Sequence, residues 1–475
     1  MQKRKTASAT FDVVGDPRPL PIKMLIYTLP IVATGILQLL FNAADVIVVG
    51  QFSGDAALAA VGSTGALINL IVNLLAGLSV GASVCAAQAY GARDDKTLSE
   101  VVHTAICVSV IGGVIFGIIG FVGSRTFLTW MGNPEDVIDQ ATLYLKIYFA
   151  GTPVMMLYNF GAAILRSVGD TRHPLVFLSI SGAINVVLNL FFVIVLGMDV
   201  DGVAYATVIS QAIAAVLVVI FLVRSKENFR LEISKLKINK KQFMNMVRIG
   251  IPAGLQGSVF SLSNVVIQSS INDFGKVVMA GNTASSNIEG FIYISMNSFY
   301  HSALTFTGQN IGAGKPERIK KVMLLSAGMA ALTGVILGAI ALTFNHSLLS
   351  LYCTENPKAI DYGLVRMGVI ATTYFFCGIM DSLTGSIRGL GNSVSPMIIS
   401  MLGACGIRVL WINTVYKWVN FTEETEKLRM LYLCYPISWI LTCIALFVCF
   451  IIVKNNVMRQ FAEHRASENA EIAVK

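Results

Sequence analysis

The sequence is short of charged residues. Only 13% of its 475 residues are Asp, Glu, Lys or Arg, whereas 55% are hydrophobic and the mean hydropathy is +0.70. A soluble globule of this length needs more polar surface than these residues supply. The composition therefore excludes a soluble protein and favours a chain that lies in a lipid bilayer.

The sequence also lacks the motifs of common enzymes. Its five histidines do not follow HExxH spacing, no GxxxxGK[ST] loop is present to bind ATP, and most of the eight cysteines lie in apolar runs without CxxC spacing. These gaps argue against an enzyme, a bound cofactor and ATP as an energy source, which leaves an ion gradient of Na⁺ or H⁺. We attribute the net charge of +8 to attraction for an anionic membrane leaflet and not to nucleic-acid binding.

The apolar residues form about twelve runs that are long enough to cross the hydrocarbon core as helices. Such a helix takes about 20 residues, and strands of a membrane barrel would be shorter and alternate in polarity. We therefore predict an all-α polytopic membrane protein. The runs cover residues 25–49, 58–89, 101–122, 143–165, 175–196, 203–223, 249–271, 277–307, 322–344, 364–387, 397–416 and 431–453.

Lysine and arginine gather in alternate loops, which predicts the topology. Positive residues favour the cytoplasmic side, so we expect both termini, 1–23 and 454–475, to be cytoplasmic tails. Residues 225–248 are a predicted cytoplasmic linker that mixes lysines with Phe229, Leu231, Ile233 and Leu236. This linker could rest on the inner leaflet and flex, or it could be a solvated connector.

The first half of the chain recurs in the second half. Residues 166–170 and Pro174 return as 388–392 and Pro396, and Pro30 and Asn42 return as Pro252 and Asn264 at the same offset. We therefore predict two homologous six-helix bundles, 24–224 and 249–453. Duplicated membrane bundles are typical of transporters, because the halves can rock about a site between them.

Polar residues in the first bundle predict an ion site. A charge within a membrane helix is costly and normally faces a cavity or a partner, and Asp45 shares a helix face with Gln38. Together with Asn185, Asn189 and Thr207, it could coordinate Na⁺ through oxygen, or it could carry a proton. The alternative is that these groups only hydrogen-bond the helices together.

The second bundle predicts a wall that binds substrate. The eighth run of the chain, 277–307, places four residues on one helix face: Glu289, Tyr293, Met296 and Tyr300. A carboxylate with aromatic and thioether neighbours suits an amphiphilic organic cation. The alternative is that this face only packs a core.

Four further charged residues have other expected roles: Asp381, Arg388 and Arg408 in the second half, and Arg166 in the first half. Asp381 is a second candidate acid, which either binds substrate or forms an ion pair with Arg408. Arg166 and Arg388 lie at helix ends, where we expect them to anchor intracellular loops.

The repeated RSVGDTRHP and RGLGNSVSP turns, together with Pro30, Asp45 and about twelve helices, resemble the multidrug and toxic compound extrusion (MATE) family, in particular its bacterial drug-efflux members. The resemblance covers nearly the whole chain, from about residue 21 to about residue 453. It implies two lobes that form a V around a central cavity, and an ion site at Gln38, Asp45, Asn185, Asn189 and Thr207.

The resemblance also has departures. Some members carry an acid at the place of Asn189, and the sodium-coupled branch has a glutamate where this chain has Phe260. The coupling ion therefore stays open between Na⁺ and H⁺.

These observations predict a secondary antiporter of the cytoplasmic membrane that exports cationic drugs, dyes and toxic compounds by alternating access. We expect it to act as a monomer, because one chain already contains both halves. The alternatives are a flippase for lipid-linked oligosaccharides, which should have a cationic cavity, and a non-transporting receptor, which needs no coupling ion.

Overall fold

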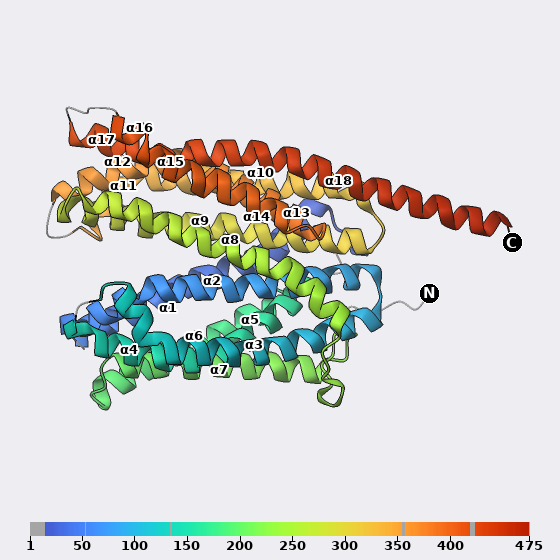
Figure 1. The fold of residues 1–475 in the computed structure, drawn as a ribbon, viewed down its shortest axis with the longest axis horizontal. Helices are drawn as coiled ribbons and strands as arrows, with labels where there is room; N and C mark the ends of the chain where they lie inside the picture. The colour runs from blue at the N-terminus through green and yellow to red at the C-terminus, as the bar shows by residue number, and fades with distance from the viewer. Residues whose placement is uncertain (1–14, 53, 134, 354–356, 419–422, 475) are drawn as a thin grey trace. The chain divides into compact units, whose positions relative to one another are not determined.

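The computed structural model describes residues 15–52, 54–133, 135–353, 357–418 and 423–474. Every regular element in these ranges is a helix, as Figure 1 shows. The contacts divide the chain into two compact units, Met1–Ile251 and Pro252–Lys475. The predicted all-α class is confirmed.

The first unit holds seven α-helices and the start of an eighth. Their bounds are α1 Leu20–Phe52, α2 Gly54–Ala92, α3 Asp95–Trp130, α4 Glu135–Ala150, α5 Thr152–Ser167, α6 Arg172–Leu190, a π-helical turn η1 Phe191–Val195, α7 Val200–Arg224, a 3₁₀ turn η2 Ile233–Lys235, and α8 Lys240–Asn272.

The second unit begins within α8. It continues through α9 Lys276–Gly312, η3 Pro316–Arg318, α10 Ile319–Thr343, α11 Asn345–Ser350, α12 Pro357–Thr373, α13 Phe375–Gly389, α14 Val394–Ser400, a π-helical segment η4 Met401–Gly406, α15 Ile407–Asn413, α16 Val415–Trp418, α17 Glu424–Tyr432 and α18 Cys434–Val474. The predicted tail from residue 454 continues α18 as helix.

The described residues contain nine helices that are long and apolar enough to cross a membrane, or up to eleven if each of two bent pairs is one span. The one predicted run outside this set is the eighth, 277–307, which coincides with α9. That helix has 37 residues, but serines and asparagines interrupt its apolar character. Each predicted span therefore has a helix, although five of them are divided into shorter elements, namely 143–165, 175–196, 364–387, 397–416 and 431–453.

The two bent pairs lie at equivalent places in the repeat. α4 and α5 meet at 47° around Gly151, and α12 and α13 meet at 46° around Tyr374. In the first pair Pro153 follows directly in the first turn of α5, where a proline ring is tolerated and an internal hydrogen bond is not needed. The duplication thus extends from sequence to helix geometry.

The turns that carry the repeated motif also have the same backbone. Gly169 and Gly391 have φ angles of +91° and +89°, a region that glycine enters without a Cβ clash. Their amides donate to the carbonyls of Arg166 (3.0 Å) and Arg388 (2.8 Å) and so close each preceding helix. The RSVGD and RGLGN spacing therefore encodes a glycine-closed helix end.

Helix α3 shows how the bundle faces both protein and lipid. A Cβ at Gly113 would lie 2.5 Å from the Cα of Pro153, and one at Gly117 would lie 2.9 Å from the carbonyl oxygen of Phe149. These glycines let α3 approach α4 and α5 closely. Ile118 and Val122 are exposed, as a face in contact with hydrocarbon requires.

The predicted linker, 225–248, differs from a free connector. Phe229 and Leu231 are buried, and the backbone amide of Leu231 donates to Leu222 of α7 at 3.0 Å. The segment lies with the first unit, and the boundary between the units falls at Pro252 inside α8. These contacts attach the first part of the predicted linker to the first unit.

Candidate ion and substrate sites

The structure brings three of the predicted ion-site residues together in the first unit. The side-chain amide of Asn189 on α6 donates to the carboxylate of Asp45 on α1 and, at 3.3 Å, to the side-chain oxygen of Asn185 one turn earlier. Asn189 is fully buried and Asp45 is half-buried. A carboxylate and two amides from different helices thus form one hydrogen-bonded cluster.

Two oxygens of the predicted ion-site residues have no hydrogen-bond partner within the part of the chain that the structure describes. They are the side-chain oxygen of Asn189 and the hydroxyl of Thr207 on α7, and both are buried. The amide orientation of Asn189 is the expected one, because its NH₂ group faces the negative Asp45. Buried oxygens without partners are costly. Carboxylate, amide and hydroxyl oxygens are the kind of group that a hard cation such as Na⁺ prefers.

Gln38 lies apart from the cluster. It is exposed on α1, and no hydrogen bond joins it to Asp45 in the part of the chain that the structure describes. Its place two turns before Asp45 keeps it on the same helix face. Gln38 therefore lies on the same face of α1 as Asp45, but no described hydrogen bond joins the two side chains.

The polar cluster has no counterpart in the second unit. The repeat that pairs Pro30 with Pro252 also pairs Asp45 with Ile267, which is buried in the core of that unit. Continuing from Pro174 and Pro396 pairs Asn189 with Trp411, whose indole donates to the carbonyl of Met430 at 3.0 Å. At these equivalent positions the first unit therefore carries polar side chains that bond to one another, and the second unit carries packing side chains.

Glu289 of the second unit is held in a buried ion pair. Arg366 on α12 donates to both of its carboxylate oxygens, at 3.0 Å from Nε and 2.7 Å from Nη2. Ser285 adds a hydroxyl donor at 2.9 Å. The expected wall residue Glu289 thus has its charge balanced by an arginine that the sequence analysis did not single out.

The ion pair belongs to a larger network. Arg366 donates through Nη1 to Asn282 at 2.8 Å, and the hydroxyl of Tyr432 donates to the same oxygen at 3.0 Å. The guanidinium also lies 5.4 Å from the ring centre of Tyr432 and 5.7 Å from that of Tyr435. Four helices, α9, α12, α17 and α18, are joined by these contacts, which is the pattern of a structural network.

Asp381 occupies a different setting. Its carboxylate accepts a hydrogen bond from Asn297 of α9 at 2.8 Å, and Asn297 also lies 3.3 Å from the hydroxyl of Tyr293. Asp381 is half-buried and Tyr293 is 38% exposed. An accessible carboxylate next to an exposed aromatic ring is the arrangement that an organic cation would contact.

The other two wall residues pack inside the unit. Met296 is fully buried among the core residues of α9, α10 and α12. The hydroxyl of Tyr300 accepts a hydrogen bond from Arg388 at 2.7 Å, and Arg388 also donates to Gln256 at 2.8 Å. These contacts give both residues a packing role and show Arg388 linking three helices.

Arg408 does not pair with Asp381. It is only 3% exposed, its Nε donates to Ser438 at 3.1 Å, and its guanidinium lies 4.3 Å from the ring centre of Tyr435. No carboxylate in the described residues lies within ion-pair distance of it. The ion pair considered from sequence is therefore absent from this structure.

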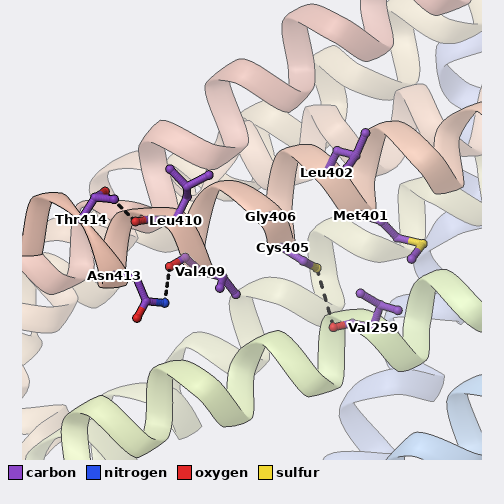
Figure 2. A pocket seen from close by; sticks show the side chains of 9 residues that line it. All are labelled: Val259, Met401, Leu402, Cys405, Gly406, Val409, Leu410, Asn413 and Thr414. Atoms are coloured by element: carbon purple, nitrogen blue, oxygen red, sulfur yellow. Dashed lines mark hydrogen bonds between the residues drawn. The ribbon is translucent and has the colours of Figure 1, made fainter.

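A cavity of about 510 Å³ opens beside the same helix, between α8 and the η4–α15 segment. Figure 2 shows that its polar side chains are already used: Cys405 donates to Val259, Asn413 to Val409 and Thr414 to Leu410. Its lining is mostly apolar, and none of the predicted site residues belongs to it. Its composition suits lipid chains more than a charged substrate.

The comparison with known protein families finds the same duplication. The MatE family model matches residues 30–191 and again 252–412, once in each half. The chain belongs to the MatE family. This finding confirms the resemblance drawn from the repeated turns, and it makes the chain a multi-span membrane transporter of the MATE type.

Individual relatives of this MATE protein are distant but span most of it. The probable multidrug resistance protein YoeA of Bacillus subtilis is 28% identical over 81% of this chain and 85% of its own length. The FAD transporter of Shewanella oneidensis is 24% identical over 77% and 82%. An outward-facing structure of a multidrug resistance MATE family transporter shares the fold with a TM-score of 0.88 and 21% identity, over 96% of this chain and all of that one.

Proposed function

We propose that this MATE transporter is a secondary antiporter of the cytoplasmic membrane that exports amphiphilic organic cations in exchange for Na⁺ or H⁺. The observation that carries the proposal is the cluster of Asp45, Asn189 and Asn185, with the buried oxygens of Asn189 and Thr207 left without partners. Such a cluster binds Na⁺ through oxygen or a proton on Asp45. Its absence from the repeated unit supports a specific role over simple helix packing.

For the exported cation, Asp381 and Tyr293 are the better candidates among the predicted wall residues. Both are accessible, and Asn297 connects them. Glu289 is neutralised by Arg366, so it offers a cation little net charge. Exchange requires that ion binding and substrate binding favour different states of the protein, because a ligand shifts an equilibrium only by its differential affinity.

Two further parts of the proposal concern the cellular setting. The concentration of lysine and arginine in alternate loops supports cytoplasmic termini. A single chain contains both repeated units, which supports function as a monomer.

The test is efflux of a fluorescent cationic dye from proteoliposomes under a separately imposed Na⁺ or H⁺ gradient. We expect one gradient to drive efflux, and Asp45→Asn to reduce the rate to that of protein-free liposomes. Asp139→Asn is the matched control, because its carboxylate is exposed and pairs with Arg125 at the surface. Efflux that either gradient drives equally well in Asp45→Asn would refute the ion site.

A second candidate is transport of a phosphate-bearing molecule, which includes the flippase alternative. Arg408 favours it, because this buried guanidinium has no carboxylate partner among the described residues. The name of the FAD transporter in Shewanella oneidensis points the same way. Proteoliposomes loaded with FAD separate the two candidates: FAD efflux without dye efflux would favour the second, and no flux of either would favour a receptor.

A further inference from the structure

A short segment between α7 and α8, residues 229–242, is fastened at both ends to the start of α3. We refer to it as the strap. At its first end, Nε2 of His103 lies 3.0 Å from the backbone nitrogen and 3.1 Å from the backbone oxygen of Glu232. At its second end, the backbone amide of Asn239 donates to the hydroxyl of Thr104 at 3.0 Å. The first unit therefore holds this segment in one place.

Side-chain burial reinforces both attachments. Phe229 and Leu231 are buried before the strap reaches Glu232, and Gln242 is buried after it and donates to Glu100 of α3 at 3.4 Å. Asn239 also accepts the backbone amide of Lys241 at 3.0 Å and so caps α8. The ends of the strap are thus specific contacts.

The middle of the strap has the opposite character. Ile233, Leu236 and Ile238 are 66%, 41% and 40% exposed. They alternate with exposed cationic side chains, namely Lys235, Lys237, Lys240 and Lys241. This attached loop exposes three large apolar side chains within six residues and does not bury them against its own protein. Such an exposed apolar surface is typical of a binding site for an external partner.

The location of the strap identifies the partner. It joins the end of one apolar helix, α7, to the start of another, α8, and it rests on the first turns of α3. It therefore lies where these helices leave the hydrocarbon. At that depth apolar side chains enter the acyl boundary and lysines meet headgroups, and anionic lipids attract them.

We propose that the strap is a binding surface for anionic phospholipid, which ties the first unit to the membrane interface. The attachment to α3 fixes the three apolar side chains and the lysines beforehand, so lipid binding has little loop ordering to overcome. Among the strap lysines, Lys235 alone forms an ion pair with a described carboxylate, that of Glu232 at 2.9 Å. Lys237, Lys240 and Lys241 remain for the headgroups, with no ion pair between any of them and a described carboxylate.

The first experiment measures lipid binding without transport. Purified protein in a neutral detergent is titrated with phosphatidylglycerol or phosphatidylcholine, and the unfolding midpoint is followed. We expect phosphatidylglycerol to raise the midpoint at low salt, and K237Q/K240Q/K241Q to lose at least half of that rise. R318Q/K320Q/K321Q, in the exposed turn at the start of α10, is the control of equal charge and should keep the rise.

Insertion is measured independently with Ile238→Trp in nanodiscs. We expect brominated phosphatidylglycerol to quench the added fluorescence, and 0.5 M NaCl to weaken the quenching, because salt screens exposed charges. An equal rise in midpoint for the strap and control variants, or quenching no stronger than with phosphatidylcholine, would overturn the proposal. A strap-dependent shift with polyglutamate but none with lipid would also overturn it and indicate an acidic protein partner.

Discussion

Glu289 and Arg366 illustrate how a buried charge gains stability from its partner. Removal of one member leaves the other uncompensated in an apolar interior, which costs about 3–5 kcal/mol. We therefore expect Arg366→Met to lower the unfolding temperature strongly in detergent. The double variant Glu289→Leu/Arg366→Met should recover most of the loss, because apolar residues of similar size replace both charges.

Comparison of the two variants decides the role of the pair. Equal unfolding temperatures for Arg366→Met and the double variant would show that the ion pair does not determine stability. Thermal unfolding followed by intrinsic fluorescence is sufficient, since Tyr432 and Tyr435 lie against the guanidinium.

Asp381 and Glu289 should respond differently when substrate binding is measured. Asp381→Asn keeps the shape of the side chain and removes its charge, so we expect cationic dye to bind about tenfold more weakly, which corresponds to about 1.4 kcal/mol. Glu289→Gln should leave dye affinity almost unchanged in protein that remains folded. Equilibrium dye binding by fluorescence polarisation measures both, and the reverse ranking would assign the cation to Glu289.

The sequence predicted the Asp45 cluster because its members stand out locally. An acid in an apolar helix is unusual, and Asn185 and Asn189 are one turn apart. It did not reveal Arg366, which lies near the start of a predicted span and resembles a headgroup anchor. Its pairing with Glu289 bridges 77 positions of sequence, and no local pattern encodes such a contact.

At the scale of helices, the close approach of α9 and α12 positions this ion pair. A Cβ at Gly281 would overlap the carbonyl of Ala359 and lie 2.8 Å from the amide of Gly363. We expect Gly281→Ala to force the helices apart and destabilise the protein by about 1–3 kcal/mol. Gly328→Ala on α10 is the control, since a Cβ there meets nothing within 4 Å.

Unfolding temperatures of the two alanine variants test this packing. The control should be neutral or slightly stabilised, because alanine has the higher helix propensity. Equal destabilisation of both variants would mean that loss of glycine, and not the crossing of α9 with α12, controls stability.

The strap offers a second prediction at this scale. His103→Ala removes the side chain that contacts both backbone atoms of Glu232, so the first end of the strap should open more often. Trypsin should then cleave after Lys235 and Lys237 faster than in the wild type. Ser99→Ala is the matched control, because it keeps the Ser99 carbonyl, 2.7 Å from Nδ1 of His103. Unchanged cleavage in His103→Ala would show that Phe229 and Leu231 suffice to hold the strap.

Helix positions were predictable from apolar runs, but their interruptions were not. The bend around Tyr374 lies within one apolar run, and neither glycine nor proline occupies the break itself. The anchored strap escaped prediction for a related reason. Its lysines indicate solvent or lipid, whereas its attachment depends on His103 and Thr104, which lie more than 125 residues earlier.

For the whole molecule, duplication preserved the scaffold and changed its interior. The bent helix pairs and the glycine turns recur, yet Asp45 corresponds to Ile267, and the buried Arg408 has no ion pair with any carboxylate that the structure describes. Comparison of the two halves of the sequence shows directly that Ile267 stands where Asp45 is repeated. Only the packed structure shows which polar groups remain unpaired, because pairing depends on helices that are distant in the chain.

Helix α8 belongs to both units, because the boundary between them falls within it. Its first turns pack on α2, where a Cβ at Gly250 would lie 2.8 Å from the Cα of Leu78, and the helix continues unbroken through Pro252 into the second unit. One alanine inserted after Ile251 would change the rotational phase of the rest of this helix by about 100°. Gradient-driven dye efflux should therefore be lost when the alanine follows Ile251. It should be preserved when the alanine follows Leu236, in the exposed middle of the strap. We therefore expect the chain to tolerate an added residue in the strap but not in the helix that both units share.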